Sequence, residues 1–356
     1  MRRMKKHTRT NLLTYLGVIA AYLLMSALSA GGSLSRSLTG QLVPICCYMS
    51  MAVSLNLTVG ILGELSLGHA GFMSVGAFSG IVAAMSLQSA IPSVPVRLAV
   101  AMLVGAAAAA IAGAIVGMPV LRLRGDYLAI VTLAFGEIIK ELINCLLVGY
   151  DSEGLHFAFN LTGGKTVDDL HLAEDGIALI KGAQGATATT TIASFTAGFL
   201  LVMVTLAVVL NLKYSRAGRA IMALRDNAIA AESIGLNITK YKMMAFVTSA
   251  ALAGAAGALY GLNFSSLQAT KFNFNTSILI LVFVVLGGLG NIWGSLIAAA
   301  ALTVLPELLR AFADYRMLVY AIVLILVMLA TNNASFTTFA SRFIGVRKKP
   351  SGKEAV

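Results

Sequence analysis

Long apolar runs separated by short polar segments repeat along almost the whole chain. A run of about 18 or more apolar residues can cross a bilayer as a helix, whereas the strands of a membrane barrel alternate over about 10 residues. The sequence therefore predicts an all-α fold, a polytopic integral membrane helix bundle. The predicted spans lie at approximately 11–30, 42–62, 66–88, 98–118, 127–149, 192–212, 243–262, 276–290, 294–310 and 317–331.

The number of crossings depends on the last part of the chain, where GGLGNIWG separates the runs at 276–290 and 294–310. If both runs cross, there are ten transmembrane helices, and if they form a re-entrant pair there are eight, so we expect about 8–10. Both alternatives place the two termini on the same side.

The placement of charge sets the expected orientation. The net charge is +11, and basic residues gather at both termini and in residues 213–242. The positive-inside rule assigns these segments, and therefore both termini, to the cytoplasm. Only 12% of the residues are charged, against about 25% in soluble proteins. The surroundings are thus membrane lipid, and the positive charge does not indicate nucleic acid.

These patterns divide the chain into a basic cytoplasmic N-terminus (1–10), a transmembrane domain (11–340) and a basic cytoplasmic tail (341–356). The first apolar run is longer than the 7–15 residues, roughly, of a signal-peptide core, so we interpret it as an uncleaved span. Residues 150–190 carry six acidic side chains and form an extracytoplasmic loop. Cys46, Cys47 and Cys145 lie in apolar surroundings and indicate neither a disulfide nor a zinc site.

Residues 213–242 contain more structure than a simple connection needs. Asp226 is expected to cap a short amphipathic helix, 227–234, that turns Ile229 and Ile234 to one side. Gly235 then supplies a left-handed C-cap. A loop with its own helix is typical of a segment that docks a partner. The candidate docking residues are Arg225, Asp226, Ala230, Glu232, Ile234 and Gly235.

A second motif, GELSLGHAGF (63–72), places ionisable groups at or inside an apolar region, where they are costly and suggest function. Its glycines allow the helix to break, and such breaks can bind solute. The candidate solute-path residues are Glu64, Ser66, Gly68, His69 and Gly71. The alternatives are that His69 is a packing residue and that Glu64 lies at the membrane interface.

Three other features bear on function. Residues 163–166 (GGKT) resemble the end of a P-loop, but Phe159 stands where that motif requires glycine. We find no catalytic set and no metal-ligand spacing, so we expect no enzymatic activity, no metal and no bound cofactor.

Glu137 and Glu141 share one helical face and indicate an interface or a polar cavity, expected at the extracytoplasmic end of their span. Glycine pairs with GxxxG spacing predict closely packed helices.

Four blocks in order carry a family resemblance: GELSLGHAGFMSVGAF, RLRGDYLAIVTLAFGEI, GRAIMALRDNAIAAESIGLNITKYKMMAF and ILILVFVVLGGLGNIWGSLIAAAALTVLPELL. Together they make the chain similar, over approximately 55–332, to the LivM-type permeases of branched-chain amino acid ABC transporters. Glu64 stands where that family usually has glutamine. The resemblance implies that residues 213–242 are the cytoplasmic segment that docks an ATPase, and we name them the coupling segment.

The same resemblance implies the partners and the place of work. The chain is expected to form a heterodimer with a second permease subunit in the bacterial cytoplasmic (inner) membrane. The importer would be completed by two cytoplasmic ATP-binding subunits, which use the ATP, and by an extracytoplasmic solute-binding protein. It would carry branched-chain amino acids by ATP-driven alternating access. Related permeases serve urea or short amides, which is one alternative. The other is an ion-coupled secondary transporter using Glu64, Glu137 and Glu141, which leaves the coupling segment without a role.

Overall fold

The computed structural model describes residues 2–309 except 33–34, 124, 152–153, 161–166, 171, 173–175 and 188, together with residues 318, 321, 322 and 325. The chain divides into two compact units, Met1–Thr303 and Val304–Val356. The described helices and strands lie in the first unit, except that the last helix, Ile292–Leu308, extends past Thr303.

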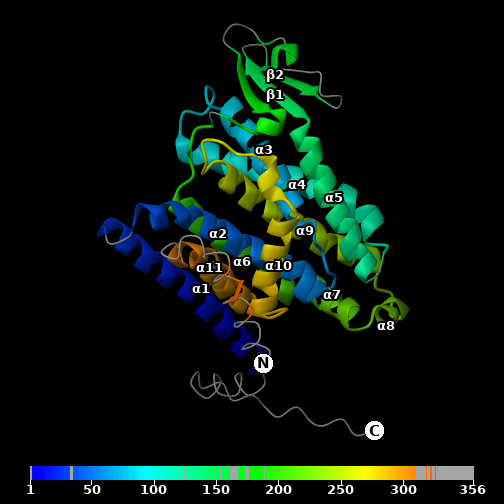
Figure 1. Cartoon of the computed structure of the whole chain (residues 1–356). Helices are drawn as coiled ribbons and strands as arrows, with labels where there is room; N and C mark the ends of the chain where they lie inside the picture. The colour runs from blue at the N-terminus through cyan, green and yellow to red at the C-terminus, as the bar shows by residue number, and fades with distance from the viewer. Residues whose placement is uncertain are drawn as a thin grey trace. The chain divides into compact units, whose positions relative to one another are not determined.

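Helices make up most of the first unit (Figure 1). In chain order they are α1 (Arg2–Ala30), α2 (Arg36–Asn56), the π-helical turn η1 (Leu57–Leu62), α3 (His69–Ser86), α4 (Val94–Val120), α5 (Asp126–Asn144), α6 (Phe195–Tyr214), α7 (Arg216–Asp226), α8 (Ala228–Ser233), α9 (Ile238–Gly261), α10 (Phe274–Gly287) and α11 (Ile292–Leu308). Single 3₁₀ turns occupy Val167–Leu170, Gly182–Gln184 and Ala269–Phe272.

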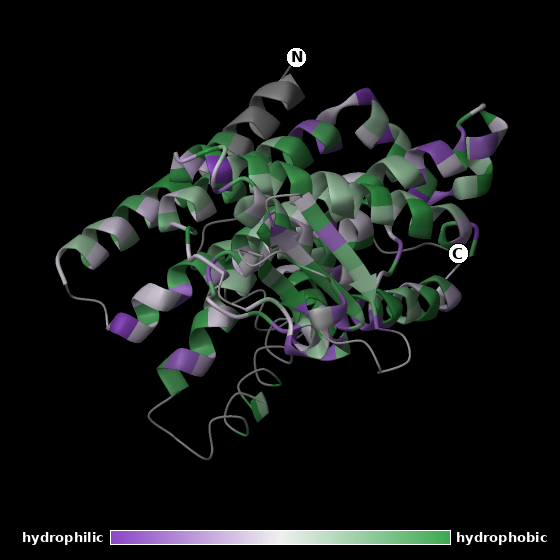
Figure 2. Ribbon diagram, turned by 90° about the horizontal axis from the view of Figure 1, so that it is seen from above, coloured by the Kyte–Doolittle hydropathy of each residue, from purple (hydrophilic) through white to green (hydrophobic). Residues whose placement is uncertain are grey.

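Within the described residues, five helical stretches are long and apolar enough to cross a membrane: Arg36–Leu62, His69–Ser86, Val94–Val120, Phe195–Tyr214 and Ile238–Gly261. Three shorter apolar helices, Thr14–Ala30, Phe274–Gly287 and Ile292–Leu308, accompany them. Hydrophobic residues run along most of these helices (Figure 2). The predicted helical membrane bundle is therefore confirmed. The predicted run 317–331 lies mostly outside the described residues, and the orientation of the termini stays a prediction.

Small residues bring three helices of the bundle core into close contact. A Cβ built on Gly76 of α3 would lie 2.1 Å from the carbonyl oxygen of Gly254 in α9. One built on Gly254 would lie 2.4 Å from the carbonyl oxygen of Gly105 in α4. The backbones of α3, α4 and α9 therefore approach as closely as glycine permits, as GxxxG spacing predicts. Gly290 and Gly294 have the same spacing, but Gly290 lies in a turn, with φ +76°.

The segment between α5 and α6 differs from the all-α prediction. It forms a three-stranded antiparallel sheet from β1 (Leu146–Asp151), β2 (Gly154–Phe159) and β3 (Ile177–Lys181), in the order β2-β1-β3. The predicted span 127–149 was too long, because α5 ends at Asn144 and the apolar residues after it enter β1. An apolar run reads the same in a helix and in a buried strand, so periodicity did not separate the two.

The bundle has two ends that differ in structure, which Figure 1 shows at the top and the lower right. At one end α7 and α8 lie beside the segment that follows α4. From there α5, with 19 residues and therefore about 28 Å long, leads to the sheet. We call these the coupling end and the sheet end.

Candidate functional site: the coupling segment and the helix break

The two short helices of the coupling segment are both capped by side chains. Ser215 Oγ accepts a hydrogen bond from the backbone N–H of Gly218 at 3.0 Å and begins α7. Asn227 Oδ1 accepts one from the N–H of Ala230 at 3.0 Å and begins α8. The prediction that Asp226 caps this helix was wrong by one residue. Asp226 is the last residue of α7, and its carboxylate pairs with the guanidinium of Arg225 at 3.0 Å.

The end of α8 is a left-handed cap, as predicted. Gly235 has φ +87°, which L side chains rarely adopt. Its N–H donates to the carbonyl oxygen of Glu232 at 2.9 Å, and the N–H of Leu236 donates to that of Ala231 at 3.1 Å. These two bonds form a Schellman motif, which satisfies carbonyls that the helix itself leaves free. Both ends of α8 are thus defined by its own residues.

The side chains of α8 divide into one buried and several exposed positions. Ala231 is buried against the rest of the unit, whereas Ala230 is exposed. Ile229 and Ile234 are 74% and 76% exposed. Ile229 on α8 and Ile234 at its end are therefore two large aliphatic side chains that the described part of the chain leaves mostly exposed.

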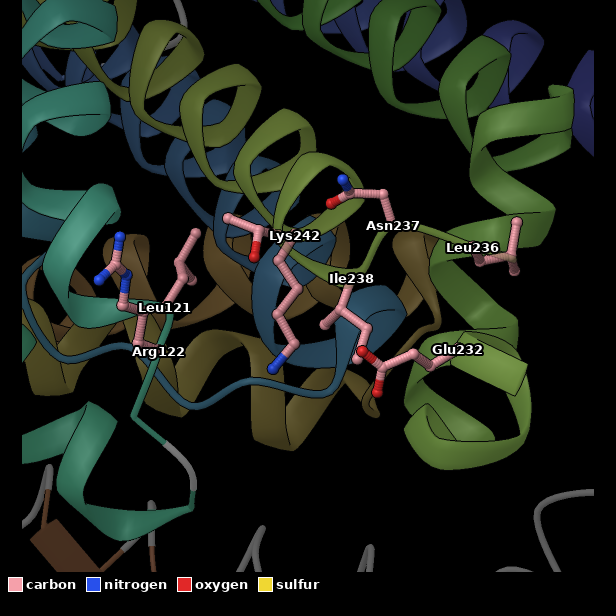
Figure 3. Close-up of a pocket in the computed structure, with 8 residues that line it drawn as sticks. Leu121, Arg122, Glu232, Leu236, Asn237, Ile238 and Lys242 are labelled. Carbon is pink, nitrogen blue, oxygen red and sulfur yellow. The ribbon is translucent and has the colours of Figure 1, made fainter. Parts of the chain in front are cut away.

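A pocket of about 390 Å³ lies between α8, the start of α9 and the segment after α4. Figure 3 shows Glu232, Lys242 and Arg122 extending from these three elements. Its full lining is Leu121, Arg122, Glu232, Leu236, Asn237, Ile238, Thr239 and Lys242. Of the predicted docking residues, Glu232 is the one that faces this pocket.

The predicted break in the GELSLGHAGF motif is present. The helix of α2 continues as η1 and ends at Gly63, which is left-handed with φ +83°. Residues 63–68 are not helical, and α3 begins at His69. The N–H groups of Leu67 and Ala70 are satisfied by Thr132 Oγ1 of α5 and Ser277 Oγ of α10, at 3.1 and 3.2 Å. Neighbouring helices therefore hold the broken backbone in place.

The candidate solute-path residues have different surroundings. His69 is buried and its Nε2 lies 2.8 Å from Ser54 Oγ. Ser66 is buried, and its hydroxyl has no hydrogen-bond partner among the described residues. Gly68 and Gly71 pack against α5, where added Cβ atoms would lie 2.2 Å from the carbonyl oxygen of Thr132 and 2.9 Å from Gly136 Cα. Their contact with solute stays a prediction.

Glu64 is directed to the coupling segment. Its carboxylate forms an ion pair with the ammonium of Lys242 in the first turns of α9. The two side chains are only 17% and 10% exposed. The local sequence pattern indicates Glu64 but not Lys242, because 178 residues separate the two and a local pattern carries no information on such a contact.

Two more basic residues of the coupling segment reach backbone carbonyls in the bundle. Arg225 Nη1 donates to the carbonyl oxygen of Gly60 in η1 at 3.0 Å. Lys213 Nζ donates to that of Gly290, between α10 and α11, at 2.9 Å. The aliphatic part of Arg225 also covers Gly63, where a Cβ would lie 2.5 Å from Arg225 Cγ. The predicted docking segment and the predicted break thus form one connected site.

The charged group of α5 lies near the sheet end. Lys140 forms ion pairs with Glu137 and with Glu141, the second at 3.1 Å. Glu137 Oε1 also accepts a hydrogen bond from the N–H of Phe274 at 2.9 Å, at the start of α10. The two carboxylates therefore share one cation. Among the described residues no group of three or more His, Cys, Asp or Glu side chains could hold a metal ion.

Comparisons with known proteins agree with this architecture. Residues 37–328 match the family described as the permease component of the branched-chain amino acid transport system, so the chain belongs to that family. It is similar to the high-affinity branched-chain amino acid transport system permease protein LivM of Salmonella typhimurium, with 35% identity over 298 residues. LivM of Escherichia coli is 33% identical over 293 residues.

Each match covers 79% of this chain and 66% of the LivM protein, so the chain spans just under two thirds of these relatives. The permease protein LivH of Salmonella typhimurium is 33% identical over 126 residues, which are 35% of this chain and 41% of LivH. No solved structure matches the chain.

Proposed function

We propose that this chain is a permease subunit of an ABC importer that carries branched-chain amino acids across the bacterial cytoplasmic membrane by ATP-driven alternating access. The observation that carries the proposal is α8, a capped two-turn helix that presents Ile229 and Ile234 outward at the coupling end. A helix of this length has too few contacts of its own to be stable alone. Docking of an ATP-binding subunit gives the exposed pair a function.

The similarity to LivM supports the substrate class, since both LivM relatives are named for branched-chain amino acid transport. Partial similarity to LivH, which is also named as a branched-chain amino acid transport system permease protein, supports pairing of two related permease subunits. On this proposal two ATP-binding subunits dock at the coupling end, which is cytoplasmic. An extracytoplasmic solute-binding protein delivers solute at the sheet end. The chain itself hydrolyses no ATP.

The ion contacts speak against an ion-coupled secondary transporter. Such a transporter needs a carboxylate that can exchange its ion on the path. The three candidates, Glu64, Glu137 and Glu141, are each paired with a lysine ammonium. The Glu64 carboxylate, whose charge is balanced by a lysine of its own, is therefore poorly suited to bind a second cation. Glu137 and Glu141 share Lys140, and the second is 64% exposed.

The test is ATP-dependent uptake by vesicles that contain the chain with its candidate permease partner, ATP-binding subunits and solute-binding protein. Ile234→Asp would place a charge in the docking contact and weaken it by about 2 kcal/mol, or roughly 30-fold. We expect uptake and solute-stimulated ATP hydrolysis to fall together, with less ATP-binding subunit co-purifying.

Ile234→Leu is the matched control, because it keeps an aliphatic side chain of the same size at the same exposed position. It should assemble and transport like the unchanged protein. If Ile234→Asp, expressed at normal levels, also retains full uptake and full co-purification, the docking role of α8 is wrong.

A further inference from the structure

Two backbone breaks meet at the coupling end. The first is the η1 turn with residues 63–68, and the second is the turn between α10 and α11, where Gly288 and Gly290 have φ +90° and +76°. Asn56 joins them: its Oδ1 accepts a hydrogen bond from the N–H of Gly290, and its Nδ2 donates to Ser295 Oγ, both at 2.8 Å. Asn56 is fully buried, so these two hydrogen bonds link the two breaks away from solvent.

Three cations of the coupling segment attach to this junction from both sides of α8. Lys213 and Arg225, which precede α8, bind the carbonyl oxygens of Gly290 and Gly60. Lys242, which follows α8, binds the carboxylate of Glu64. These contacts attach the residues on both sides of α8 to the two breaks.

The contact of Lys242 differs from the other two in a way that suits it to transmit movement. Glu64 follows the left-handed Gly63 in a non-helical segment, and its backbone N–H keeps one hydrogen bond to η1, to the carbonyl oxygen of Thr58 at 3.1 Å. Both partners are more than four-fifths buried, so their attraction is screened less than that of a surface pair. Lys242 itself belongs to α9, which contacts α3 on the far side of the break.

We infer that Glu64 and Lys242 form a positioning pair, through which displacement of α8 turns the break at residues 63–68. The inference rests on the proposed function and deepens it. It assigns Glu64 a role in coupling through its ion pair, in place of direct contact with solute. The two roles predict different results when the charges of residues 64 and 242 are exchanged. An ion pair forms again with the charges reversed, whereas a glutamate that contacts solute is lost.

The experiment measures solute transported per ATP hydrolysed in vesicles containing the whole complex. Glu64→Lys and Lys242→Glu each place two like charges in contact, and each should lower this ratio about tenfold or more. The double exchange restores opposite charges and should bring the ratio back to within about threefold of the unchanged protein. Leucine serves as the solute probe, delivered by the solute-binding protein.

Arg36→Glu is the matched control, because Arg36 is exposed at the start of α2 and lies outside both the coupling segment and the ion pair. It makes the same reversal of charge at the far end of the helix that leads to the break and should leave the ratio near that of the unchanged protein. The solute concentration for half-maximal uptake and the melting temperature of the complex are measured alongside. We expect the concentration for half-maximal uptake to stay the same, which separates coupling from solute contact. The melting temperature should fall in the two single variants and recover in the double exchange, so the ratio is compared only among complexes that remain folded.

Three results would overturn the inference: singles with the normal ratio, a double exchange as impaired as the singles, or Arg36→Glu impaired equally. Where a charge-reversed single does not fold, Glu64→Met decides, because it keeps most of the side-chain volume and loses both the charge and the oxygen that accepts from Lys242. It should lower the ratio in a folded complex, and a normal ratio would refute the positioning pair. Failure of the proposed function is a different outcome, namely no ATP-dependent leucine uptake by the unchanged complex.

Discussion

At the scale of single residues, the caps of α8 show how closely function is tied to local backbone chemistry. Asn227 and Gly235 fix the two ends of a helix with one buried side chain, Ala231. A helix so short gains little from propensity, so its caps contribute much of its order. The exposed Ile229 and Ile234 keep their positions only while those caps hold.

Gly235 provides the sharpest residue-level test. Nothing lies within 4 Å of a Cβ built there, so a substitution acts through backbone strain and not through a clash. Gly235→Val should cost about 1–2 kcal/mol, because a β-branched residue resists positive φ. Uptake and the co-purified ATP-binding subunit should both fall.

Gly235→Asn is the control for this position, since asparagine tolerates the left-handed region. It should retain most of the activity. Equal activity of the valine and asparagine variants in an uptake assay would show that the cap geometry does not matter for docking.

At the scale of elements, the sequence predicted what local patterns encode. The apolar runs predicted α2, α3, α4, α6 and α9, and the glycine at position 235 predicted the end of α8. The sheet was missed, because the apolar residues 146–149 fit a helix and a strand equally well. The Glu64–Lys242 pair and the Arg225 contact with Gly60 were missed because residues far apart in sequence make them.

The contact between α3 and α9 gives the element-level prediction. A Cβ on Gly257 of α9 would lie 2.0 Å from the carbonyl oxygen of Met73 in α3. Gly257→Ala must therefore push the two helices apart, at a cost of about 1–3 kcal/mol or more. A lower melting temperature of the purified protein in detergent is the expected result.

Gly40→Ala is a suitable comparison, because Gly40 lies in α2 with nothing within 4 Å of a Cβ. Its melting temperature should stay the same or rise slightly, as alanine favours helix over glycine by about 1 kcal/mol. If Gly257→Ala melts at the same temperature as Gly40→Ala, the small-residue contact does not limit the stability of the bundle.

At the scale of the first unit, the two ends of the bundle serve different proposed partners. The coupling end carries α8 and the junction of two breaks, whereas the sheet end carries β1, β2 and β3 together with the charged group of α5. α5 connects the two ends and packs against Gly68 and Gly71 beside the first break. Residues 63–68 are therefore in contact with an element that extends to the sheet end.

This assignment of ends requires that the sheet end is extracytoplasmic and the coupling end cytoplasmic. Single cysteines can test it in a background where Cys46, Cys47 and Cys145 are replaced by alanine. Gln184 beside β3 and Ser233 in α8 are both exposed, one at each end. A membrane-impermeant maleimide should label Gln184→Cys in intact cells and Ser233→Cys only after permeabilisation.

Both cysteines should react in detergent, which controls for accessibility. The positive-inside rule gives the expected direction, since Arg216, Arg219 and Arg225 lie in the same segment as Ser233. The opposite pattern would place α8 outside the cell, where no ATP-binding subunit could reach it, and would refute the proposed function.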